Sequence, residues 1–357
     1  MSESAFSASY EEARSKFLEA SRAFGGRVES FAHPQPGPDG RPVYCDIAWH
    51  GSRRPEKLLV TISATHGVEG FCGSGAQVAW LVEREPLPAD TALLQLHAIN
   101  PQGYAWLRRV TEENVDLNRN FVDFANPPRN PGYEELHPIL CPTTWHEGTA
   151  EEMQRGLDAY RAAHGMDQLR TAMIKGQYKY ADGIFFGGSE ASWSHRLLKD
   201  IIAEHCAGVR LAFVVDYHTG LGPRGQGERF CDNLPGTVGW ELAERWFDKD
   251  LTSSHIDPSL SQVLHGINYD GILEAAGDTL VIMVALEFGT LPLPQVRLAL
   301  TADNWLHRFG KVDSALGQAI KAQIREAFYG DDPAWKSDVL RRSFETQRLA
   351  LRGLAGS

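Results

Sequence analysis

The sequence has few cysteines, and none of them is spaced like a metal or redox pair. Its 357 residues include five cysteines, an odd number, and no CxxC motif occurs. Secreted domains that depend on disulfides need an even set of paired cysteines. The sequence therefore argues against a disulfide framework and favours a reducing compartment, the cytoplasm.

Long apolar runs and a basic leader are also missing. No apolar run approaches the roughly 20 residues that an α-helix needs to span a bilayer. The first residues, MSESAFSASYEEARSKF, are polar and acidic, whereas a secretory signal has a basic segment followed by an apolar one. We therefore expect neither a secretory signal nor a membrane partner.

Positive charge is scarce relative to negative charge. The sequence has 35 Lys and Arg against 46 Asp and Glu, which gives a net charge of −11 with His neutral. Nucleic-acid binding depends on Lys and Arg that neutralise phosphates, so we expect no nucleic-acid partner. A small anionic substrate remains compatible, because it needs only one or two local arginines.

The apolar residues form several short runs that alternate with helical patterns. Continuous apolar runs, typical of strands that are covered on both faces, or alternating ones lie at 43–49, 58–64, 91–100, 209–220 and 279–290. Helices are expected at 10–24, 75–84, 192–206 and 237–249, through most of 296–328, and as a short last helix after Trp335. This alternation favours an α/β fold with a largely parallel sheet and helices on both faces.

Residues from about 126 to 188 interrupt this alternation. A proline-rich stretch that resembles a loop precedes an expected helix, which Thr149 would cap together with Glu152 in a capping box. The aromatic, glycine-flanked run GQYKYADGIFFGG follows. We expect a long insertion within a single domain spanning residues 1–357. The part from Tyr178 to Phe186 would form either a wall or lid over a site, or a packed surface loop.

Four of the apolar runs end in polar residues with chemical uses. His66 and Glu69 follow the first, an Asn-Pro-Gln-Gly turn at 100–103 follows the second, and His218 and Glu287 end the last two. Ligands in open α/β sheets bind beyond the carboxyl ends of the strands. These side chains are therefore expected to converge.

Two imidazoles and one carboxylate form a common ligand set for catalytic zinc, with a fourth position left for water. His66 and Glu69 can face one point if their segment turns into a helix, and His218 completes the set. Glu287 would be a spare carboxylate that acts as a general base. One alternative is that the histidines lie near strand ends by chance, because the chain has 13 histidines and a lone HxxE is a weak signal. The other is that Glu287 only caps a turn. Cys72 is expected to be structural. Four other histidines are expected in the core or on the surface: His97, His137, His205 and His307.

The stretch NPQGYAWLRRVTEENVDLNRNF, residues 100–121, adds arginines and asparagines near this site. Arg provides a planar fork of donors and Asn an amide donor, which together suit the recognition of a carboxylate. The alternative is a polar surface turn with ordinary salt bridges.

The order of these motifs resembles that of the carboxypeptidase A-like zinc metallopeptidases, including an uncharacterised bacterial branch. It is also similar to the related aspartoacylase and succinylglutamate desuccinylase deacylases. The matching blocks run from about residue 58 to 290. The resemblance implies one three-layer α/β/α domain around a mixed, mostly parallel sheet. It makes His66, Glu69 and His218 the ligands of one zinc ion, and Glu287 the general base and later the general acid.

The resemblance also implies roles for the polar stretch. Arg109, or the neighbouring Arg108, would polarise the substrate carbonyl, while Asn118 and Arg119 would bind the substrate carboxylate. Asp116 would accept a hydrogen bond from His66 and fix its tautomer, and Tyr269 is the candidate for a pocket tyrosine. Val68 stands where digestive carboxypeptidases often have Arg, and HGVE and DYHT are nearer to the HGNE and DLHNT of the deacylases.

The expected function is zinc-dependent hydrolysis of an amide bond, peptide or N-acyl, next to a free carboxylate. The partner would be a small peptide or an N-acyl amino acid, and the alternative activity is that of an N-acyl-amino-acid deacylase of the aspartoacylase type. Two other classes of protein would use only part of this pattern. A metal-binding module without catalysis would not need Glu287, and a nucleophilic hydrolase using a serine or Cys72 would not need a metal.

Overall fold

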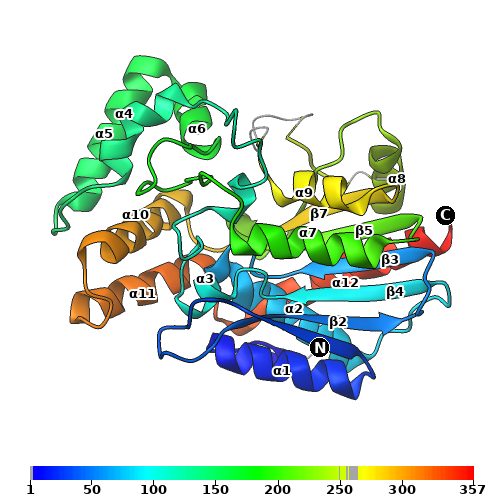
Figure 1. Cartoon of the computed structure of the whole chain (residues 1–357). Helices are drawn as coiled ribbons and strands as arrows, with labels where there is room; N and C mark the ends of the chain where they lie inside the picture. The colour runs from blue at the N-terminus through cyan, green and yellow to red at the C-terminus, as the bar shows by residue number, and fades with distance from the viewer. Residues whose placement is uncertain (1–2, 249, 255, 257–263) are drawn as a thin grey trace.

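The computed structural model describes residues 3–248, 250–254, 256 and 264–357. A seven-stranded sheet with the order β1-β2-β4-β3-β5-β7-β6 runs through the molecule (Figure 1). Its central strands β4, β3, β5 and β7 are parallel, and the pairings at both edges are antiparallel. The strands are β1 Arg27–Ala32, β2 Tyr44–Gly51, β3 Lys57–Ile62, β4 Thr91–His97, β5 Leu211–Arg224, β6 Glu228–Cys231 and β7 Leu280–Gly289.

Helices cover both faces of the sheet (Figure 1). α1 (Tyr10–Ala23), α2 (Gly70–Glu83), α8 (Val238–Phe247) and α12 (Pro333–Ala355) pack on one face, and α7 (Trp193–Cys206) and α9 (Asn268–Ala276) on the other. The expected three-layer α/β/α fold around a mixed sheet is therefore confirmed. The expected short last helix is wrong, because α12 has 23 residues and buries a row of apolar side chains.

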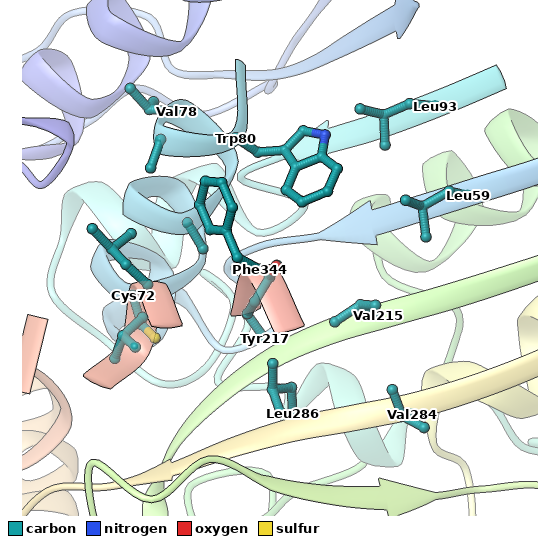
Figure 2. Packing of buried hydrophobic residues seen from close by; sticks show 14 of the residues in the cluster. Leu59, Cys72, Val78, Trp80, Leu93, Val215, Tyr217, Val284, Leu286 and Phe344 are labelled. Carbon is teal, nitrogen blue, oxygen red and sulfur yellow. The ribbon is translucent and has the colours of Figure 1, made fainter. Parts of the chain in front are cut away.

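Alternate residues of the central strands face opposite helical layers. Leu59, Val215 and Val284 point toward α2 and α12 (Figure 2), whereas Val60 and Val214 belong to the core beneath α7 and α9. Side chains of successive strand residues point to opposite faces of a sheet, so a continuous apolar run buries both. Full burial of each such side chain stabilises the fold by roughly 1.5–3 kcal/mol.

Two further helices lie near the carboxyl ends of the central strands. They are α10 (Leu293–Phe309) and α11 (Ala315–Phe328). Val296 and Phe328 from these helices pack against Val68, which follows β3. The carboxyl end of the sheet is therefore enclosed by α10 and α11.

The insertion is more helical than its sequence indicates. α4 (Pro131–Leu140), α5 (Thr149–His164) and α6 (Met166–Ile174) pack around their own apolar cluster, against which Leu298 of α10 also lies. The loop expected for the proline-rich start of the insertion is wrong in part. Pro131 occupies the first turn of α4, where proline is tolerated. The expected Thr149 cap is also wrong: Gly148 is the N-cap, and the Thr149 hydroxyl accepts a hydrogen bond from the His146 amide. That the chain forms a single domain stays a prediction.

All five cysteines are free and buried. No described helix is both long enough and apolar enough to cross a membrane. The cytoplasmic location stays a prediction.

Candidate metal centre

The first two candidate ligands lie on a tight turn after β3. Ala64 has a φ of 60°, and His66 stands directly before the single 3-10 turn η2 (Gly67–Glu69). The amides of Gly67 and Val68 donate to the carbonyls of Arg109 and Arg108. The turn is thereby held by the loop that also carries the candidate catalytic arginine.

Two glycines allow the HGVE and NPQG motifs to pack against each other. A Cβ on Gly67 would lie 2.1 Å from the carbonyl carbon of Gly103. Gly103 belongs to the short helix α3 (Pro101–Ala105), and the Asn100 side chain accepts a hydrogen bond from its amide. Only glycine permits this backbone-to-backbone approach, so the HGVE and NPQG motifs pack as one unit.

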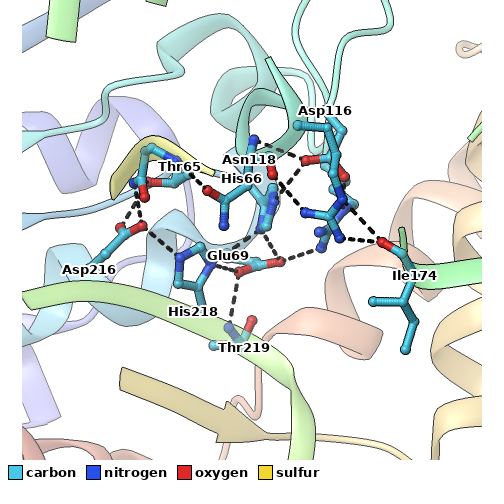
Figure 3. Close-up of polar contacts among 12 residues, drawn as sticks. Thr65, His66, Glu69, Asp116, Asn118, Ile174, Asp216, His218 and Thr219 are labelled. Atoms are coloured by element: carbon cyan, nitrogen blue, oxygen red, sulfur yellow. Dashed lines mark hydrogen bonds and ion pairs between the residues drawn. The ribbon is translucent and has the colours of Figure 1, made fainter. Parts of the chain in front are cut away.

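His66, Glu69 and His218 converge at the carboxyl end of the sheet (Figure 3). His66 Nδ1 lies 3.0 Å from Glu69 Oε1, and His218 Nδ1 lies 3.2 Å from Glu69 Oε2. The two Nδ1 atoms are 3.3 Å apart. Ligands at about 2.0–2.1 Å from a tetrahedral zinc ion are separated by about 3.3 Å, so the spacing fits.

The outer nitrogens of both imidazoles contact carboxylates. His66 Nε2 lies 3.2 Å from Asp116 Oδ1, and His218 Nε2 lies 2.6 Å from Asp216 Oδ2. A carboxylate in this position accepts the Nε2 hydrogen and leaves the lone pair on Nδ1. Both Nδ1 atoms and the Glu69 carboxylate then face one point, where a cation would be stabilised. The residues therefore fit a metal ion.

The electrostatics of the cluster also attract positive charge. Burial disfavours charge on His218, but Asp216 and Glu69 outweigh that effect and raise its pKa well above the usual range. Burial likewise opposes ionisation of Glu69, yet the nearby imidazoles and Arg109 hold its pKa low. The Thr219 amide donates a further hydrogen bond to Glu69 Oε2.

Sequence reasoning missed Asp216 as a partner of His218. Thr65 Oγ1 and Asn268 Nδ2 donate to its two oxygens, at 2.8 and 2.6 Å, so three donors hold this carboxylate. The signal was present in DYHT, because residues two apart on a strand point to the same face. No sequence pattern indicated that Asn268 would contact Asp216, since this contact follows only from the packing of α9.

Arg109 and Arg108 point in different directions. Arg109 lines the cavity over the metal ligands and donates to Glu69 Oε1 and Asp116 Oδ2. Arg108 contacts Asp303 and Asn114 instead and is not part of the cavity wall. Of the two arginines, only Arg109 is therefore placed to meet a substrate.

Glu287 lies on β7 directly beside His218 on β5. Its Oε1 accepts a hydrogen bond from the Leu221 amide, and its side chain lines the cavity. Burial raises its pKa to about 8, and the charge of Glu69 adds to this effect. Among the described residues it forms no hydrogen bond or ion pair with either imidazole. Glu287 therefore lies beside the three candidate ligands without belonging to them.

The candidate carboxylate-binding residues also line the cavity. Arg119, on η3 (Leu117–Arg119), already donates through Nε and Nη2 to the Ile174 carbonyl and through Nη1 to the Asn118 carbonyl. The Asn118 side chain accepts from the Asn268 amide. Tyr269 lies outside the cavity wall: it packs in the core, and its hydroxyl accepts from Asn233. Its neighbour Asn268 lines the cavity instead, because adjacent helical residues face different sides.

The cavity above the ligands has a volume of about 500 Å³. The insertion forms part of its wall, and the aromatic run contributes one residue, Phe185. Tyr178 from the same run donates a hydrogen bond to the Arg119 carbonyl. The insertion residues in the wall are Met166, Leu169, Arg170, Met173, Ile174 and Phe185.

A third acid in the wall, Asp232, was also missed. It follows β6, and burial raises its pKa to about 7, against the opposing charge of His218. Nothing in the sequence separates this aspartate from a surface one, because β6 is only four residues long.

Comparison with known proteins places the chain in a family. The family model DUF2817, described as a protein of unknown function, matches residues 6–342. The chain belongs to this family. No curated protein matches it.

Several solved structures share part of the fold. Carboxypeptidase A from Helicoverpa armigera is 16% identical, with 90% of this chain and 74% of that chain covered and a TM-score of 0.46. A murein-tripeptide amidase from Escherichia coli O157 is 14% identical, with coverages of 82% and 91% and a TM-score of 0.36. An aspartoacylase family protein from Mesorhizobium loti is 13% identical, with coverages of 78% and 67% and a TM-score of 0.36. At these identities and TM-scores the likeness assigns no activity to this chain.

Proposed function

We propose that the protein is a zinc-dependent hydrolase that cleaves an amide bond, peptide or N-acyl, next to a free carboxylate. The observation that supports this most directly is the trio of His66, Glu69 and His218, whose ligand atoms face one point while both Nε2 atoms contact other carboxylates. Such a trio with one open side is typical of catalytic rather than structural zinc. One zinc ion per chain would occupy it.

A bound zinc ion would supply Lewis acidity toward water and the substrate carbonyl. Glu287 would take a proton from the attacking water and deliver it to the leaving amine. Its raised pKa, about 8, suits a group that both accepts and donates a proton near neutral pH. The Leu221 amide fixes one of its oxygens, which leaves the other for water.

Arg109 would stabilise the oxyanion that develops on the carbonyl oxygen. Glu69 and Asp116 hold its Nη1 and Nε, while Nη2 has no acceptor among the described residues. An arginine that is already fixed in position need not reorganise to stabilise the charge that develops in the transition state. Asn118 and the hydrogens of Arg119 that are not bound to carbonyls would hold the substrate carboxylate.

The first test combines metal analysis with a kinetic screen. We expect about one zinc per chain, and hydrolysis of dipeptides or N-acyl amino acids that a chelator abolishes and added zinc restores. His218→Ala should lose both metal and activity. Glu287→Gln should keep the metal but lose turnover by on the order of 10²–10⁴, because an amide cannot accept the proton.

A second measurement tests the recognition of the carboxylate. Wild type should hydrolyse substrates with an amidated carboxylate poorly, and Arg119→Ala should mainly raise KM for free-acid substrates. Stoichiometric zinc in His218→Ala would contradict the ligand assignment. Equal cleavage of free-acid and amidated substrates would contradict the specificity, and activity that resists chelation would favour a nucleophilic hydrolase.

A further inference from the structure

Arg297 on α10 lines the cavity but has no anionic partner. The side chain is half-buried, and its Nε is covered from solvent without a hydrogen-bond acceptor in the described structure. No ion pair or hydrogen bond involves its guanidinium in the described part of the chain. An N–H that is covered from water without an acceptor is costly, because it has lost its hydration without a replacement.

The fully buried arginines of the described chain differ from Arg297 in this respect. Arg108 contacts Asp303, Arg119 donates to the Ile174 carbonyl, and Arg229 and Arg342 both donate to Asp250. Burial lowers the pKa of Arg297, and no carboxylate opposes that effect. Because guanidinium stays protonated in proteins, Arg297 brings to the cavity wall a positive charge without an ion-pair partner among the described residues.

The insertion places a second cation in the same cavity. Arg170 on α6 lines the wall and has no ion pair among the described residues. α6 and α10 belong to one packed unit, because Leu169 and Met173 share an apolar cluster with Leu298. Both arginines therefore stand on elements outside the turns that carry the metal ligands and the Asn118–Arg119 pair.

We propose that Arg297, aided by Arg170, binds a second carboxylate of the substrate, distinct from the one next to the scissile amide. The substrate class is then a peptide or N-acyl amino acid with two anionic groups. This inference rests on the proposed function, since it names the substrate of the same site. It accounts for a charged side chain that neither the metal centre nor the fold uses.

The test uses two pairs of peptides that differ only in charge. The first pair is N-acetyl-Glu-Ala and N-acetyl-Gln-Ala, and the second is N-acetyl-Ala-Glu and N-acetyl-Ala-Gln. Wild type should prefer the Glu member of at least one pair by about 10- to 100-fold in kcat/KM. This is the fold-change that corresponds to a charge-assisted bidentate hydrogen bond. Arg297→Gln should lose that preference and keep its rate on the Gln member.

Three variants calibrate the result. Arg297→Lys should retain only part of the preference, since an ammonium lacks the planar fork, and Arg170→Gln should lose less than Arg297→Gln. Arg155→Gln removes an exposed arginine of α5 that does not line the cavity, and it should behave as wild type. A wild type without preference in either pair would overturn the proposal, as would a preference that Arg297→Gln retains.

A binding measurement separates this proposal from the proposed function. In the Glu287→Gln background, titration calorimetry measures the affinity for all four peptides without turnover. Tighter binding of a Glu member that is lost in Glu287→Gln/Arg297→Gln supports the carboxylate site even if wild type cleaves none of them. Equal affinities within both pairs would overturn the site independently of catalysis.

Discussion

At the scale of single residues, the candidate metal centre includes two carboxylates outside the ligand trio. Asp116 and Asp216 each face the outer nitrogen of one imidazole. Three donors, from Thr65, Asn268 and His218, direct hydrogens at Asp216. A group with only acceptors is therefore required at this position.

Asp216→Asn should weaken zinc binding by about 10- to 100-fold, the usual effect of losing such a partner. The NH2 group of the asparagine would face the donors of Thr65 or Asn268, which repels it. The neutral side chain would also make His218 a weaker base. Zinc affinity is measured by competition with a chromophoric chelator. Asp158→Asn, on the exposed face of α5, is the matched control and should bind zinc like wild type. Unchanged affinity in Asp216→Asn would contradict the role.

At the scale of elements, the site depends on the close packing of two turns. The η2 turn lies against α3, and the loop at residues 107–110 binds its amides. This arrangement aims His66 and Glu69 at one point and simultaneously brings Arg109 to Glu69. A shift of this turn would disturb the ligands and the arginine together.

Gly67→Ala should displace the turn and destabilise the protein by roughly 1–3 kcal/mol or more, the cost of overpacking. Its Cβ would lie 2.1 Å from the Gly103 carbonyl carbon, and backbone atoms cannot swing aside as a flexible side chain can. The midpoint of thermal unfolding and the zinc content should both fall. Gly356→Ala is the control: the nearest atom to its Cβ would be the Arg352 carbonyl oxygen at 3.6 Å, an ordinary contact, so little change is expected. A stable, zinc-replete Gly67→Ala would show that the contact is unimportant.

At the scale of the whole molecule, the core contains a histidine that burial favours in the neutral form. His97 at the end of β4 is fully buried, stacks on Phe17 at 4.5 Å, and places Nε2 2.9 Å from the Ser74 hydroxyl. Burial lowers its pKa to about 4. This agrees with the expectation that His97 is a core residue.

His97 should make the fold sensitive to acid. Its pKa is about 4 in the folded protein and about 6.5 in the unfolded chain, so between these values the unfolded chain binds more protons. The free energy of unfolding should therefore fall as the pH drops from about 6.5 to 4, by at most about 3 kcal/mol from this residue. Denaturant unfolding across this range measures the slope. His97→Gln should flatten it, whereas His146→Gln, at an exposed position, should not. An equal slope in His97→Gln would exclude His97 as the cause.

The sequence by itself determined the central strands and the convergence of His66, Glu69 and His218. Continuous apolar runs indicated the strands, and polar residues at the carboxyl ends of parallel strands converge for a geometric reason. His66, Glu69 and His218 could therefore be predicted without coordinates. α4 and the length of α12 could not, because tertiary packing overrode a proline-rich composition in one case and a polar one in the other.

Tertiary structure alone decided which polar residues share the cavity. Arg108 and Arg109 are equivalent in the sequence, yet Asp303 attracts one and Glu69 the other. Asp232 and Arg297 reach the cavity from β6 and α10 through chain crossings that no local pattern encodes. Periodicity fixes which face of an element is buried, but the neighbour of that face depends on contacts between residues far apart in the chain.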